Sequence, residues 1–242
     1  MLQLVSKDLS KSDAQCLKDL QALVDAESNF EQKKYKAQKL WGSKSQGRTE
    51  RNFERIKNVL TEITVSVETC NYCEHNEATD IEHIYPKSFF PERTFIWSNY
   101  LLACKTCNTG YKLDKCLVVD SNNAILEVPR GSEPPFTDLA FINPRHEDPN
   151  KLLFLNTQTW EFDFLPSLTT QQLAKAQGTI RILSLNSRSA LKKAREDNAR
   201  YIFERLFKLK QILEATTIQE IKSILSPFNN LNSKLDLADL KD

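Results

Sequence analysis

The sequence lacks the long apolar runs that would place it in a membrane. No hydrophobic stretch among its 242 residues approaches the roughly 20 residues needed to span a bilayer. The first residues reach Lys7 and Asp8 before the apolar core of a signal peptide could form. We therefore expect a cytoplasmic protein, in which thiols stay reduced and paired cysteines favour metal binding over disulfides.

The sequence also lacks a large excess of either charge. Its net charge of +1 does not mark the whole chain as a nucleic-acid binder. Two segments are locally basic: residues 31–57 hold nine basic and three acidic residues, and residues 188–210 hold eight and three. Each segment is either a surface that contacts phosphates or the solvated face of a helix. With 40% hydrophobic and 27% charged residues, the chain can bury a core and is no disordered tail.

Four of the six cysteines are paired at a spacing typical of metal sites. These four are Cys70, Cys73, Cys104 and Cys107, in two C-x-x-C pairs. Each pair forms a tight turn that presents two sulfurs, so the two pairs can hold one ion tetrahedrally. We predict one closed, structural zinc ion that clamps the ends of the segment between the pairs. Cys16 and Cys116 are interpreted as free thiols without an assigned role.

The segment between the cysteine pairs carries a second kind of chemistry. Asp80-Ile81-Glu82-His83-Ile84 alternates polar and apolar residues, as a half-buried strand does. Strand geometry places Glu82 and His83 on opposite faces, but a bulge or strand end near Pro86 could bring both to one pocket. Phosphodiester hydrolysis needs a base and a hard cation. His83 suits the base, because imidazole titrates near neutral pH, and Glu82 suits Mg²⁺, which prefers carboxylate oxygen.

The residues around these motifs resemble the HNH endonucleases. The shared pattern is Asp-x-Glu-His-Ile-x-Pro from Asp80, then Asn99, then Cys-x-x-Cys-Asn ending at Asn108, with Lys112 after it. In the order His, Asn, Asn, this is the H-N-N form of the motif. The resemblance implies a zinc-stapled ββα-metal core that holds a catalytic Mg²⁺ or Mn²⁺ ion in addition to the zinc.

The same resemblance implies a role for each position. His83 would be the general base, and Glu82 and Asn108 would be ligands of the Mg²⁺ ion. Asn99 would brace the loop that carries His83, and Asp80 would lie behind the ligands or act as an extra one. Many family members have Asp at the position of Glu82. This departure leaves open whether Asp80 or Glu82 holds the ion.

A weaker resemblance covers most of the chain. Segments 70–74, 80–88, 142–149 and 179–186 are similar to the HNH proteins of the Septu and retron-associated anti-phage defence systems, called PtuB. In those systems the nuclease works beside an ATPase, PtuA. The resemblance therefore implies DNA as the substrate and a PtuA-like ATPase from the same operon as the partner.

The expected fold class is α+β, with a small HNH core flanked by mainly α-helical regions. The predicted regions are 1–67 (helical), 68–118 (nuclease core with zinc knuckles) and 119–242 (loops and a hairpin, then helices). Helices are expected over residues 8–30, from Thr49, from Thr169 or Thr170 to Ser184, from Ser187, and from Thr217 to Ser226 before Pro227. A strand is expected at 117–119 and a hairpin between 152–155 and 160–165, and the tail from Asn229 is polar and acidic.

Two helical segments carry apolar stripes that are expected to face a core. The first stripe is Phe53, Ile56, Leu60 and Ile63, and the second is Leu191, Ala194, Asn198, Tyr201, Ile202, Leu206, Leu209 and Leu213.

Other interpretations of the central segment stay open. Lys87, Lys105 and Lys112 could meet substrate phosphates. A non-catalytic zinc module that binds nucleic acid or a partner protein would have no need of the set Glu82, His83, Asn99 and Asn108. A nuclease acting on RNA, such as tRNA, is not excluded, because such a site contacts the phosphate backbone and not the sugar.

Overall fold

The computed structural model describes residues 1–64 and 69–225. The predictions for Pro227 and for the tail from Asn229 lie outside these residues. The chain divides into two compact units, Met1–Lys192 and Lys193–Asp242. The regions predicted at 1–67 and 68–118 therefore fall in one unit, whereas the region predicted at 119–242 is divided between two.

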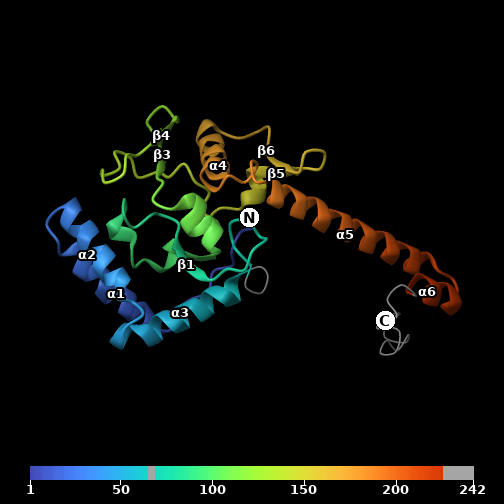
Figure 1. The fold of residues 1–242 in the computed structure, drawn as a ribbon, viewed down its shortest axis with the longest axis horizontal. Helices are drawn as coiled ribbons and strands as arrows, with labels where there is room; N and C mark the ends of the chain where they lie inside the picture. Colours follow the sequence, from blue (N-terminus) through green and yellow to red (C-terminus); the bar gives the residue numbers. More distant parts are fainter. Residues whose placement is uncertain (65–68, 226–242) are drawn as a thin grey trace. The chain divides into compact units, whose positions relative to one another are not determined.

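The described residues form a mixed α+β fold with small antiparallel hairpins, which confirms the predicted class. The helices are α1 (Lys11–Asp25), α2 (Phe30–Gly42), α3 (Glu50–Ile63), α4 (Thr170–Leu183), α5 (Ser189–Glu214) and α6 (Ile218–Leu225), and the strands are β1 (Asp80–His83), β2 (Tyr100–Ala103), β3 (Leu117–Val119), β4 (Ile125–Glu127), β5 (Leu153–Asn156) and β6 (Glu161–Phe164) (Figure 1). The strands pair as three separate two-stranded sheets, β1–β2, β3–β4 and β5–β6. The strand predicted at 117–119 and the predicted hairpin, now β5–β6, are thereby confirmed.

Helix α1 is shorter than predicted, because a second helix begins soon after it. The Ser10 side chain accepts the backbone N–H of Asp13 and caps α1. Asn29 caps α2 in the same way, through the N–H of Gln32. The segment expected as one helix over 8–30 therefore ends at Asp25, and residues 30–42 of the basic stretch form α2.

Helix α3 buries the stripe predicted for it. Phe53, Ile56, Leu60 and Ile63 are all buried in the core of the first unit, where they lie with the side chains of β2. Burying four large apolar side chains stabilises a fold by about 1.5–3 kcal/mol each. This stripe fixes the N-terminal helices against the β1–β2 hairpin.

The second predicted stripe does not become a core. Leu191, at the start of α5, is buried, but Tyr201, Ile202, Leu206, Leu209 and Leu213 are between 50 and 77% exposed. The described part of the second unit contains only the rest of α5 and α6, so few groups are present to cover that face. The prediction of an inner stripe along α5 was wrong beyond its first turns.

No helix in the described ranges is both long enough and apolar enough to cross a membrane.

Candidate metal centre and the cavity beside it

The four paired cysteines converge on one point. One sulfur from each of Cys70, Cys73, Cys104 and Cys107 lies within 4.8 Å of all the others, and the group is buried. The sulfurs of Cys73 and Cys104 are 3.9 Å apart. Zinc–sulfur bonds of about 2.3 Å in a tetrahedron require sulfurs about 3.8 Å apart, so the set is positioned to bind one Zn²⁺. The structure thus brings the four predicted ligands together at one point, as a zinc site requires.

Two side chains and one backbone N–H donate hydrogen bonds to these sulfurs. The Asn76 amide donates to Cys104 Sγ at 3.7 Å, and the Cys107 N–H donates to the same sulfur at 3.4 Å. The Arg188 guanidinium donates to Cys107 Sγ at 3.3 Å and lies 4.6 Å over the Tyr111 ring. Four thiolates around Zn²⁺ carry a net charge of −2, so a neighbouring cation stabilises the filled site.

The cysteine cluster positions the elements that carry the other predicted residues. The pair at Cys104 and Cys107 opens the π-helical segment Thr106–Lys112, which follows β2 directly. Strand β1 pairs with β2 in antiparallel register, with Asp80 opposite Ala103 and His83 opposite Tyr100. Along the chain, the β1–β2 hairpin is thus followed by the helical segment. The four sulfurs bring together the cysteine pair before the hairpin and the pair after it.

His83 is buried, and among the described residues only its Nε2 has a hydrogen-bond partner. Its Nε2 lies 3.0 Å from the carbonyl oxygen of Thr94. Because a carbonyl can only accept, Nε2 carries the proton and Nδ1 presents a lone pair in the neutral ring. Burial lowers the pKa of His83 well below its ordinary value, and the charges of Lys87, Lys112 and Lys44 lower it further. The imidazole is therefore neutral at neutral pH, the form that accepts a proton.

The indole of Trp41, from the end of α2, holds the imidazole from the side. The two ring centroids are 4.2 Å apart in an edge-to-face arrangement, and Tyr100 lies 5.2 Å from the imidazole on another side. Aromatic contacts of this kind fix a ring beyond what burial alone does. The N-terminal helical region thus supplies a wall of the His83 site.

Asn99 ties down the loop that follows His83. Its side-chain oxygen accepts the N–H of Tyr85 at 2.7 Å, and its amide nitrogen donates to the carbonyl oxygens of Tyr85 at 3.1 Å and Arg93 at 2.8 Å. Asn99 is itself buried. One amide therefore locks both the segment after β1 and the turn Pro91–Arg93, which precedes Thr94.

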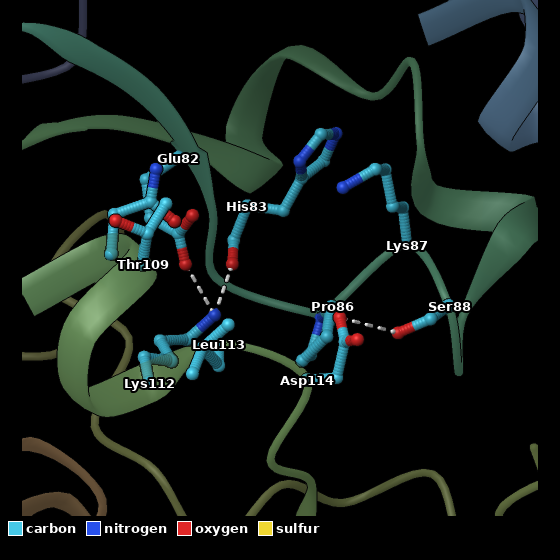
Figure 2. Close-up of a pocket in the computed structure, with 10 residues that line it drawn as sticks. Glu82, His83, Pro86, Lys87, Ser88, Thr109, Lys112, Leu113 and Asp114 are labelled. Atoms are coloured by element: carbon cyan, nitrogen blue, oxygen red, sulfur yellow. Dashed lines mark hydrogen bonds and ion pairs between the residues drawn. The ribbon is translucent and has the colours of Figure 1, made fainter. Parts of the chain in front are cut away.

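Glu82 is paired with a lysine inside the fold. The Lys112 ammonium donates to Glu82 Oε1 and to the carbonyl oxygen of His83, both at 2.5 Å, and both side chains are at least 90% buried (Figure 2). We expected Lys112 to meet phosphates, but the structure places it beneath the hairpin, where it bridges β1 and the helical segment. Asp80, by contrast, is half-buried and accepts from the Asn108 amide at 3.0 Å.

Several of the predicted residues line one cavity of about 140 Å³. Its walls include Glu82, His83, Lys87, Asn108 and Lys112. The bend after β1 near Pro86 therefore brings Glu82 and His83 to one cavity, although they occupy successive positions of a strand. Asp80 does not line it; Asp80 lines a neighbouring cavity of about 470 Å³, which also reaches Asn108.

Two further lysines differ from the prediction. One predicted lysine lies away from both cavities, and one lysine that lines a cavity was not predicted. Lys105 is exposed and lines neither cavity. Lys44, which lies 4.5 Å over the Trp41 ring, lines the larger cavity. Trp41 and Lys44 belong to the basic segment noted in the sequence, but no spacing rule links that segment to His83. The Thr94 carbonyl leaves no trace in the sequence at all, because any residue has one.

Comparison with models of known protein families and with curated proteins found no match, so the site must be interpreted from its own geometry.

Proposed function

We propose that the chain is a metal-dependent endonuclease of the HNH type that hydrolyses phosphodiester bonds in DNA. The observation that carries the proposal is His83 in its cavity. Its Nε2 proton is held by a carbonyl, its Nδ1 has no partner among the described residues, and the cavity is shared with two carboxylates, an amide and two lysines. The order of His83, Asn99 and Asn108 around two cysteine pairs supports the same reading, through the resemblance to HNH enzymes.

His83 would act as the general base. A neutral imidazole whose Nε2 is anchored can take a proton from water only at Nδ1. The Nε2–Thr94 hydrogen bond and the Trp41 contact keep the ring in place while it does so. Asn99 would act through the backbone, because it fixes the segment that continues from His83.

The donor set of the cavity fits a hard divalent ion. Mg²⁺ is usually held by one or two carboxylates, with water and substrate phosphate completing its shell. Glu82 and Asn108 would hold it, and Asp80 supports Asn108 through the amide nitrogen, which leaves the amide oxygen for a cation. A bound Mg²⁺ or Mn²⁺ would supply charge neutralisation at the phosphate and at the leaving oxygen. In the present arrangement Lys112 provides the positive charge beside Glu82.

The proposal is tested by comparing two histidine variants for plasmid nicking in Mg²⁺ or Mn²⁺. His83→Ala should lower the rate about 10²- to 10⁴-fold, the usual contribution of a general base. His146→Ala removes an exposed histidine that lines neither cavity and should cleave like the wild type. Equal nicking by a folded, zinc-loaded His83→Ala protein would contradict the assignment, and parallel RNA substrates show whether DNA is the correct polymer.

We further propose that the nuclease works with a partner, an ATPase of the PtuA type. The resemblance to PtuB proteins suggests this partner, and α5 supports it with exposed apolar side chains. These are Tyr201, Ile202, Phe203, Leu206, Phe207, Leu209 and Leu213. So many exposed apolar side chains on a helix otherwise rich in charge are typical of an interaction surface.

Light scattering on the chain, alone and with its operon neighbour, tests the partnership. Replacing Ile202 and Leu206 by Ser should abolish co-elution, whereas replacing the exposed, charged Arg200 and Lys210 of the same helix by Ser should weaken it little. If the isolated wild type cleaves DNA at full rate and never co-elutes with the neighbour, a free-standing nuclease is the better interpretation.

A further inference from the structure

Two lysines beside His83 have no anionic partner. Within the described ranges, the ammonium groups of Lys44 and Lys87 make no hydrogen bond or ion pair, although both residues are half-buried. The third lysine near the imidazole, Lys112, is paired with Glu82. Half-buried ammonium groups usually find an acceptor, because removing a charge from water without one is costly. The Lys44 ammonium lies 4.5 Å over the face of the Trp41 ring, which offers no anionic oxygen.

The two ammonium groups act on each other and on His83. Burial lowers the pKa of Lys44, and the charge of Lys87 lowers it further; Asp80 opposes this. Burial also lowers the pKa of Lys87, and the charge of Lys112 adds to the effect, whereas Glu82 and Asp114 oppose it. The imidazole and the Lys87 side chain turn toward each other (Figure 2). An anion placed among these groups would relieve their repulsion.

The two lysines come from distant parts of the chain and line adjoining cavities. Lys87 follows β1 and lines the cavity that holds His83. Lys44 follows α2 and lines the larger cavity, with Asp80 and Trp41. Asn108 borders both cavities. A nucleic-acid strand that lay across both cavities would therefore meet both lysines.

We propose that Lys44 and Lys87 form a phosphate-binding site for a nucleic-acid strand, with Lys87 at the phosphate next to His83 and Lys44 at a neighbouring phosphate. The inference rests on the proposed nuclease function, and it assigns to the N-terminal helical region a direct part in holding substrate. It also gives the lysines of the site different roles: Lys112 stabilises the fold through its ion pair with Glu82, whereas Lys44 and Lys87 bind phosphates.

The test measures the binding of fluorescent oligonucleotides without Mg²⁺ or Mn²⁺, at several salt concentrations. Each phosphate contact that is lost should weaken binding and reduce the slope of log K against log salt by about 0.9 on duplex DNA or about 0.7 on a single strand. Lys44→Ala and Lys87→Ala should each lower the slope by about this amount, and the double variant by about twice as much. Lys39→Ala removes an exposed lysine of α2 outside both cavities and should leave the slope unchanged.

Zinc content and thermal unfolding must match the wild type for each variant, and Lys44→Arg and Lys87→Arg should retain most of the slope. Unchanged slopes in both alanine variants, or a wild type that binds no oligonucleotide, would overturn the inference.

Matched DNA and RNA strands show which polymer is preferred. If binding depends on both lysines but the wild type cleaves neither polymer, the proposed nuclease function fails and the phosphate site stands. If His83→Ala abolishes cleavage but Lys44→Ala and Lys87→Ala leave the salt slopes unchanged, the nuclease function stands and the phosphate site fails.

Discussion

The cysteine cluster and the His83 cavity are built from the same segment of the chain, but only the first is complete by itself. The four sulfurs of the cluster lie close enough together to bind one ion. Asn76 and Arg188 hydrogen-bond to two of these sulfurs. In the cavity, His83 Nδ1 and Lys87 have no hydrogen-bond partner in the described ranges of the chain. Buried polar groups in a folded protein are normally satisfied, so groups left without partners point to a partner from outside.

We call the cysteine cluster the closed site, because its groups are satisfied within the chain, and the His83 cavity the open site. The largest expected effect comes from disrupting the closed site. Cys70→Ser or Cys107→Ser should release the ion and unfold the core, because structural zinc contributes about 10–16 kcal/mol to small zinc domains and that binding energy is folding energy. Elemental analysis should find about one zinc per chain in the wild type and much less in the variants. A zinc-free variant that melts like the wild type would show that the cluster does not hold the fold together.

The Glu82–Lys112 pair shares a feature with each site. Its two charges are buried and satisfy each other, as the groups of the cysteine cluster do, but both residues line the His83 cavity. Glu82→Gln or Lys112→Met should each lower the free energy of unfolding by about 3–5 kcal/mol, because each leaves one buried charge without its partner. The double variant should recover much of this loss, since neither charge remains. Denaturant unfolding of all four proteins gives the coupling energy. Additive losses would mean that the two side chains do not stabilise each other.

Asn108 should behave as a member of the open site, although it directly follows a zinc ligand. Asn108→Ala should retain the zinc and most of the stability, because its one described side-chain hydrogen bond is to half-buried Asp80. We expect nicking to fall at least about 10²-fold, as for the loss of a group that acts on the transition state. Zinc content and nicking measured on the same preparation decide the point, and loss of zinc would move Asn108 to the closed site.

The sequence was most informative where local spacing determines geometry. Two C-x-x-C turns present their sulfurs whatever surrounds them, and the sulfurs of Cys70 and Cys104 met as expected. The alternation from Asp80 to His83 gave strand β1, and the stripe in α3 gave a buried helix face. The strand and the helix face follow from a simple period. The two cysteine pairs lie far apart in the sequence, but each pair is itself a local motif, and four thiol ligands for one ion require that the two pairs meet.

The sequence was least informative where a feature depends on what packs against it. The stripe of α5 has the same helical spacing as that of α3, but Leu206 and Leu213 are exposed while Ile56 and Leu60 are buried. A period indicates which face is apolar and not what covers it. In the same way, the lysine of the HNH-like pattern could not be assigned to the interior, because the burial of Lys112 depends on Glu82, 30 residues away.

Arg188 offers the smallest and most discriminating test, because it completes the closed site from far away in the sequence. Its guanidinium reaches Cys107 Sγ from the residue before α5, and it stacks on Tyr111, so it lends one positive charge to a thiolate-rich site. Loss of a group that supports a metal ligand typically lowers metal affinity 10- to 100-fold. We therefore expect Arg188→Ala to fold with zinc bound but to lose the ion sooner in a chelator competition. Arg188→Lys should fall between, since it keeps the charge and loses the planar stacking. The matched control is Arg181→Ala, at an exposed arginine paired with Glu127 away from the cluster. Equal zinc affinity in all of these variants would show that the four cysteines are sufficient, and that the closed site needs nothing beyond its motif.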